Sequence, residues 1–163
     1  MSQNFGGDFG DNDAAAADDF FIPKKAVWVV KEIDVVGAYF NGPGPALSES
    51  VTVWRGKGNS PGSSHVVAIF NNIVGADDGG SFAIPLGKGV RLRSGHYWLS
   101  VVINMPLDPN GEWAWENQTT QENDPAMWEN PGDGYNGCAH WTEETECVGA
   151  PGDEMFVLKG RAN

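Results

Sequence analysis

The 163-residue sequence predicts an all-β fold, and three observations lead to this prediction. Glycine, proline, aspartate and asparagine, which favour turns, are spread along the whole chain instead of being gathered in one linker. Apolar and polar residues alternate over short segments, which is typical of strands with one buried face. No segment has the apolar spacing of a helix of useful length, since residues 142–146 are too few to count.

The clearest alternation lies in residues 97–104, where the apolar residues at positions 97, 99, 101 and 103 share one face. Trp98 then points to the other, non-core face. The other predicted strands are 26–40 (one long bent strand or two short ones), 50–54, 65–70, 82–92 and 154–160. Strands at this spacing predict an antiparallel β-sandwich of the jelly-roll or immunoglobulin-like type, with a closed barrel as the alternative.

The length suits one domain. Residues 1–17 are mostly Gly, Asp, Asn and Ala, and we predict an extended N-terminal arm there. The arm would lie along a sheet edge of its own domain or add to the sheet of a neighbour. Residues 18–163 form the predicted β-sandwich domain. Within it, residues 106–153 are a long, loop-rich segment that holds four of the seven tryptophans and both cysteines.

The formal net charge of −12 argues against nucleic acid and anionic membrane surfaces as partners, because both are negatively charged. No apolar run approaches the roughly 20 residues that span a bilayer, so we expect no membrane insertion. The first residues lack the basic and apolar segments of a signal peptide. The chain is then either cytoplasmic or a mature segment whose leader is absent, and the cysteines favour the second.

Cys138 and Cys147 are the only cysteines, and the eight residues between them suit a loop that returns on itself. Their spacing fits neither a CxxC redox motif nor a four-ligand zinc site. We predict a disulfide, which would stabilise the fold by up to about 3 kcal/mol, with two buried free thiols as the alternative. A disulfide indicates an oxidising compartment, and therefore an extracellular or cell-surface location.

Aspartates near the start of the chain are the candidate metal ligands. Asp11, Asp13, Asp18 and Asp19 could supply carboxylate oxygens to a structural calcium ion, although aspartates in ordinary turns look the same in a sequence. We expect no other cofactor. The three histidines, at positions 65, 96 and 140, are isolated and show no metal-binding spacing.

The sequence contains no GxSxG nucleophile motif and no glycine-rich phosphate loop before a helix. We therefore predict that the chain is not an enzyme. A hydrolase whose site is assembled from distant residues is the alternative, and it would need a deep pocket that holds one of the histidines beside a carboxylate or a serine.

Tryptophans beside amides and carboxylates are the strongest indication of ligand binding, because sugars stack their C–H groups on exposed aromatic rings. The candidate ligand-binding residues are Trp54, Trp98, Trp113, Trp115 and Trp128. The alternative is that these rings form a second, smaller core under the long loops.

Several motifs together resemble a known kind of module. They are the stretches at 17–23 (ADDFFIP), 95–101 (GHYWLSV), 113–115 (WAW) and 128–132 (WENPG), with the two cysteines after them. Over residues 17–160 the chain resembles the accessory β-sandwich modules of large secreted bacterial proteins. The resemblance implies a non-catalytic role beside proteases, adhesion domains or sorting signals, and it assigns no binding residues.

We therefore expect a non-catalytic extracellular binding or adhesion module, with a glycan or a surface protein as its partner. The first alternative is a structural subunit of an extracellular filament or surface layer that self-associates through the N-terminal arm. The second alternative is the hydrolase described above.

Overall fold

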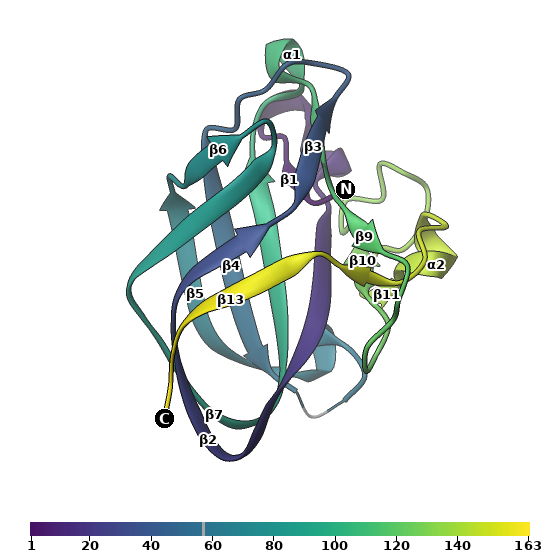
Figure 1. The fold of residues 1–163 in the computed structure, drawn as a ribbon. Helices are drawn as coiled ribbons and strands as arrows, with labels where there is room; N and C mark the ends of the chain where they lie inside the picture. The colour runs from purple at the N-terminus through teal and green to yellow at the C-terminus, as the bar shows by residue number, and fades with distance from the viewer. Residues whose placement is uncertain (57) are drawn as a thin grey trace.

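The computed structural model describes residues 1–56 and 58–163, and it confirms the predicted all-β, antiparallel class (Figure 1). The strands are β1 (Gln3–Asn4), β2 (Ala15–Val35), β3 (Gly37–Phe40), β4 (Ser48–Arg55), β5 (His65–Ile73), β6 (Ala76–Asp78), β7 (Ser81–Asn104), β8 (Glu112–Trp115), β9 (Asn117–Gln118), β10 (Met127–Glu129), β11 (Thr142–Glu143), β12 (Asp153–Glu154) and β13 (Phe156–Ala162). Two short helices, α1 (Leu107–Asn110) and α2 (Glu144–Cys147), lie in the loop-rich segment.

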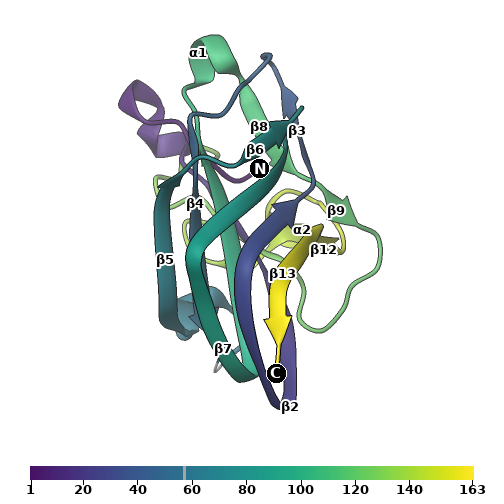
Figure 2. The same cartoon turned by 60° about the vertical axis from the view of Figure 1, so that its left-hand side comes forward.

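Two long antiparallel strands, β2 and β7, form the centre of the main sheet. Their first paired stretch joins residues 17–22 to 95–100, and β10 and β4 flank it. Their second stretch joins residues 27–35 to 82–93, and β13 and β6 flank that one. Both halves therefore belong to one hydrogen-bonded sheet that bends over (Figure 2). In a sandwich of two stacked sheets, by contrast, the halves would not share paired strands.

The bend coincides with residues that interrupt regular strand pairing. Pairing stops over residues 23–26 of β2, where Pro23 has no N–H to donate and Lys25 adopts a left-handed conformation (φ 69°). On β7, Gly89 (φ 79°) passes so close to β2 that a Cβ atom there would lie 2.4 Å from the carbonyl oxygen of Val30. A side chain at Gly89 would therefore push the two strands apart.

The bend encloses one core between the two halves of the sheet. Phe20, in the first half of β2, stacks on Tyr97 with ring centroids 5.5 Å apart. It also meets the edge of Phe156 in β13 at 6.2 Å. The aromatic rings of both halves thus belong to one cluster of buried residues.

The first residues pack into their own domain, which is the first of the two arrangements expected for residues 1–17. β1 pairs with the end of β7, and Ser2 and Gln3 are fully buried. The side chain of Gln3 donates to the carbonyl oxygens of Met105 and Gly111 and accepts a hydrogen bond from the N–H of Trp113. β1 belongs to the main sheet and β2 begins at residue 15, so the main sheet starts before the predicted boundary between residues 17 and 18.

Candidate functional site

The prediction that five tryptophans offer exposed rings is wrong for four of them. Trp98, Trp113, Trp115 and Trp128 are at most 2 % exposed, and Trp54 is half-buried. The indole N–H groups of Trp113, Trp115 and Trp128 donate to backbone carbonyl oxygens, as in the 2.7 Å bond from Trp113 to Gly80, whereas that of Trp98 is buried without a partner among the described residues. These four rings therefore stabilise the fold and are not available to stack on a sugar.

Trp98 is buried because a second layer covers the outer face of the sheet. It packs with Ala17 and Met127 in a small cluster that is separate from the main core. Trp54 and Trp141 pack against this cluster. Their own two rings meet edge to face, with centroids 6.0 Å apart. The alternative of a second, smaller core is thus confirmed for Trp98, whereas the tryptophans at 113, 115 and 128 belong to the main core.

The four aspartates predicted as calcium ligands do not come together. Asp11 is exposed, and Asp13 accepts a hydrogen bond from the backbone N–H of Phe5. Asp18 and Asp19 are buried in β2, and their side chains point to opposite faces of the strand. Asp18 accepts a hydrogen bond from the backbone of Glu154, whereas Asp19 contacts His96. The predicted set therefore separates into two exposed or half-buried residues and two buried ones, and only the buried pair lies at a candidate site.

The candidate site begins with a cavity of about 690 Å³ between β2 and the segment from β12 into β13. Its carboxyl groups come from four places in the sequence: Asp18 and Asp19, Asp34, Glu122, and Asp153 with Glu154. We call this space the acidic cavity. Exposed residues, Glu122 among them, line it beside fully buried ones, so it opens to solvent. No lysine, arginine or histidine within the described part of the chain lines it.

Backbone hydrogen bonds hold these carboxyl groups in place. Asp18 accepts the N–H of Glu154 at 2.9 Å and the N–H of Asp19 at 2.7 Å. Asp153 accepts the N–H of Glu122 with one oxygen, and its other oxygen is buried without a partner. Glu154 is 2 % exposed, and neither of its carboxyl oxygens has a hydrogen-bond partner among the described residues.

Burial and mutual repulsion raise the pKa values of these groups. Burial, together with the charge of Asp153, raises the pKa of Asp18 to about 8. Burial, with the repulsion of Glu144, raises the pKa of Glu154 well above its ordinary value. Burial also raises the pKa of Asp153 and of Glu144. The acidic cavity therefore holds protons at a pH at which ordinary carboxyl groups have lost them.

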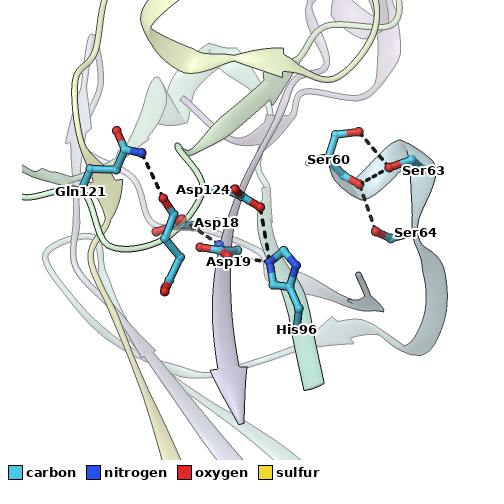
Figure 3. A network of polar contacts seen from close by, with 9 residues as sticks. Asp18, Asp19, Ser60, Ser63, Ser64, His96, Gln121 and Asp124 are labelled. Atoms are coloured by element: carbon cyan, nitrogen blue, oxygen red, sulfur yellow. Dashed lines mark hydrogen bonds and ion pairs between the residues drawn. The ribbon is translucent and has the colours of Figure 1, made fainter. Parts of the chain in front are cut away.

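A second group of polar side chains lies on the other side of β2. His96 projects from β7, and its Nε2 atom lies 2.5 Å from Oδ2 of Asp19 and 3.8 Å from Oδ2 of Asp124 (Figure 3). We call these three residues the His96 cluster. Phe21 stacks on the imidazole ring with centroids 4.4 Å apart and planes 5° apart. Burial raises the pKa of Asp19 to about 6, although the charge of His96 works against the rise.

The His96 cluster meets part of the requirement stated for a hydrolase, because it places a histidine beside carboxylates. Among the residues that the structure describes, no hydroxyl or thiol group hydrogen-bonds to the imidazole of His96. The cluster thus offers metal-ligand or acid–base chemistry without an adjacent nucleophile.

The predicted disulfide between Cys138 and Cys147 is confirmed. It joins the loop after β10 to the end of α2, and both cysteines pack against the main core. The bridge thereby holds α2, which carries the buried Glu144, against the body of the domain. No helix in residues 1–56 or 58–163 has the length and apolar character that crossing a membrane requires.

Sequence reasoning missed most of the site. Glu154 was part of a predicted closing strand, and His96 was judged an isolated histidine. The one available signal was the pair Asp18–Asp19 between apolar residues, since consecutive acids in a strand place one carboxyl group on each face. The partners of these acids lie far away in the sequence and are brought close only by the fold.

Comparisons with family models, with curated proteins and with solved structures each find no match to this chain. The resemblance to accessory modules of secreted bacterial proteins therefore stays a prediction.

Proposed function

We propose that this chain is a non-catalytic extracellular binding module whose acidic cavity binds an organic cation, a protonated amine carried on an apolar chain. The observation that carries the proposal is Glu154, a fully buried carboxyl group at the cavity wall with no hydrogen-bond partner for either oxygen among the described residues. The proposed ligand-binding site is therefore the acidic cavity, in place of the tryptophan rings.

A buried and unpartnered carboxyl group is unfavourable in the free protein. Transfer of such a group from water without a compensating hydrogen bond costs on the order of 1–3 kcal/mol, and more when it is charged. In the described part of the chain, Glu154 faces the carboxyl groups of Asp18, Asp153 and Glu144, and the cationic group that acts on it is the amino group of Met1, which makes no hydrogen bond to it. A cationic ligand would add positive charge and supply the missing hydrogen bonds, so binding would recover this penalty.

The spacing of the carboxyl groups favours an ammonium group over a calcium ion. Calcium needs six to eight oxygen ligands within about 2.6 Å of the ion. Among the described residues, the acids of the cavity do not bring three carboxyl oxygens within 4.8 Å of one another. An ammonium group can bind through a single carboxylate and complete its hydrogen bonds with backbone carbonyl oxygens or water, so it does not require three clustered carboxylates.

The apolar lining favours a cation with a hydrocarbon chain. Phe20, Met155 and Phe156 line the cavity together with the acids. Aromatic faces attract cations, and apolar side chains bury methylene groups. Asp34, which also lines the cavity, is already paired with Lys159 at 2.5 Å, so the free acceptors lie deeper, near Glu154.

The extracellular part of the proposal rests on the disulfide. A bridge between Cys138 and Cys147 persists in oxidising compartments and is rare in the cytosol. The net charge of −12 is consistent with a cationic partner, because it raises the local concentration of cations near the cavity.

The test is calorimetric titration of the full chain with cadaverine (pentane-1,5-diamine) at about pH 8, where the acids ionise more readily. Pentane-1,5-diol is the neutral control, since it has the same length without the charge. We expect cadaverine to bind with a Kd below about 1 mM and the diol not to bind. Equal binding of both compounds, or binding of neither, would show the proposal to be wrong.

Two variants locate the binding. We expect Glu154→Gln to weaken cadaverine binding by more than about tenfold, since roughly 1.4 kcal/mol corresponds to a factor of ten. Glu146→Gln makes the same chemical change at an exposed position and should leave the affinity unchanged. Asp153→Asn provides a second removal of charge at the cavity if Glu154→Gln fails to fold. Affinity that is unaffected by both cavity variants would contradict the proposal.

A further inference from the structure

We propose that Asp19, His96 and Asp124 bind a divalent transition-metal ion of the zinc type. The three side chains come from β2, β7 and the loop before β10, and each offers one ligand atom. Those ligand atoms lie within 4.8 Å of one another (Figure 3). Asp19 also lines the acidic cavity, but its partners His96 and Asp124 do not, and the metal site does not depend on the amine proposed there.

The sheet register brings Asp19 and His96 to the same face. Residue 19 pairs with Trp98 and Phe21 pairs with His96, so Asp19 and His96 are diagonal neighbours on the two strands. Asp124 reaches the same point from the loop after β9. Two rigid strands and one loop therefore aim a nitrogen and two oxygens at a common position.

The second observation is that buried atoms in the cluster lack hydrogen-bond partners outside it. The side chain of Asp19 is 0 % exposed, and outside the cluster its oxygens have no hydrogen-bond partner among the described residues. The Nε2 atom of His96 is also buried, and its neighbours within the cluster are the carboxylate oxygens of Asp19 at 2.5 Å and Asp124 at 3.8 Å. Two ligands about 2.0 Å from a tetrahedral zinc ion lie about 3.3 Å apart, so a bound ion would replace the Asp19–His96 contact and move the two side chains slightly apart.

Neighbouring residues fix the ring in this position. The Phe21 ring covers one face of the imidazole, and Gly56 leaves room at its edge. A Cβ atom at Gly56 would lie 2.7 Å from Nδ1 of His96. The backbone N–H of Gly56 also donates to the carbonyl oxygen of His96 at 2.8 Å. Metal ligands that are oriented by their surroundings lose less entropy on binding.

The ligand chemistry selects the class of metal. Imidazole nitrogen with carboxylate oxygen suits zinc and its first-row neighbours, whereas calcium and magnesium prefer oxygen alone. Two carboxylates also neutralise the charge of a divalent ion beside a neutral imidazole. Three protein ligands leave a fourth position for water, and the exposed fractions of 16 % for His96 and 35 % for Asp124 leave that side accessible.

The test is titration of the chelator-treated full chain with ZnCl₂, followed by the visible absorption of Co²⁺ as a substitute ion. We expect one Zn²⁺ per chain with a Kd below about 10 µM. His96→Gln and Asp124→Asn should each weaken binding by more than about 100-fold, because loss of a ligand exceeds the effect of losing an orienting residue. Both variants should also abolish the Co²⁺ absorption of a four-coordinate site.

The controls distinguish this site from surface binding and from the acidic cavity. His65→Gln and Asp133→Asn change exposed residues of the same types and should leave Zn²⁺ affinity unchanged. Glu154→Gln should lose cadaverine binding and keep Zn²⁺ binding. No one-to-one binding, or binding that survives both His96→Gln and Asp124→Asn, would overturn the proposal.

Discussion

At the residue scale, single buried polar groups connect distant parts of the chain. Gln3 is the clearest example, because its amide makes three buried hydrogen bonds to residues more than 100 positions away. Nothing in a run of Gly, Asp and Ala around it signals this role. The sequence predicts an extended arm there without saying where it lies, because local composition cannot reveal a partner that only the fold supplies.

We expect Gln3→Ala to lower the free energy of unfolding by about 2 kcal/mol or more, because it leaves two carbonyl groups and one N–H buried without partners. Urea denaturation measures the loss. Asn4→Ala, at the exposed neighbouring position, is the control and should lose less than about 1 kcal/mol. A smaller loss at Gln3 than at Asn4 would mean that the N-terminal strand does not contribute to the fold.

Trp98 differs from Trp54 in burial, although the two lie side by side in paired strands. We expect Trp98→Ala to destabilise the fold by about 3–5 kcal/mol, as large core residues do. Trp54→Ala should cost less, since its ring is only half-buried. Thermal unfolding of the two variants makes the comparison. Equal losses would contradict the covered outer face that the structure describes.

Glu154 gives a prediction for pH. Its pKa is raised from 4.5 by burial and by the charges of Glu144, Asp18 and Asp153, while the amino group of Met1 lowers it. The folded protein thus keeps a proton that the unfolded chain releases above about pH 4.5. The stabilising contribution is fully present below that pH and is lost as the pH rises toward the raised pKa.

We therefore expect the midpoint of thermal unfolding to fall by several degrees from about pH 5 to about pH 8. The fall should be smaller in Glu154→Gln, which cannot ionise, and unchanged in Glu146→Gln. Differential scanning calorimetry provides the midpoints. A midpoint that rises over this range, or an equal fall in all three proteins, would show that Glu154 is an ordinary carboxylate.

At the element scale, the bend in β2 determines the fold. The strand prediction succeeded for the second part of β7, because residues 97–104 alternate regularly between the core and the outer face, but the predicted strands 82–92 and 97–104 are parts of one continuous strand. It failed for the start of β2, because Ala and Asp have low strand propensity and are held there by pairing with β7 and β10. The exposure of Trp98 was also mispredicted, since the covering residues come from a loop-rich segment whose path no local pattern indicates.

Lys25 tests the bend directly, because it adopts a left-handed backbone conformation that costs about 1 kcal/mol for a residue with a side chain. We expect Lys25→Gly to leave stability unchanged or to raise it by up to about 1 kcal/mol. Lys24→Gly, one residue earlier, is the control and should lower stability. Chemical denaturation of both variants measures the difference, and a loss at Lys25 as large as that at Lys24 would contradict the bend.

At the scale of the whole molecule, one bent sheet, a covering layer and a single disulfide bring acids from separate segments together. The all-β class and the Cys138–Cys147 bridge were predictable, because alternation and cysteine spacing are local signals. The acidic cavity was not, because Asp18 and Glu154 meet across 136 positions of sequence. Composition identified many acids and could not tell which of them the fold would bury.

The disulfide should contribute to the stability of the whole domain. On the loop-entropy model we expect the Cys138→Ser, Cys147→Ser double variant to lose about 3 kcal/mol in the free energy of unfolding. The wild-type chain under reducing conditions should lose a similar amount. Denaturation with and without reductant makes the comparison, and equal stability in both conditions would mean that the bridge constrains only a loop that unfolds independently.

The most direct measurement for the central claim is a crystal structure of the full chain grown with cadaverine at about pH 8. We expect one ammonium group of the diamine within hydrogen-bond distance of Glu154, with its hydrocarbon chain against Phe20 and Phe156. Density for the diamine elsewhere, or Glu154 turned out to solvent and the cavity occupied by water alone, would contradict the assignment of the acidic cavity as a cation-binding site.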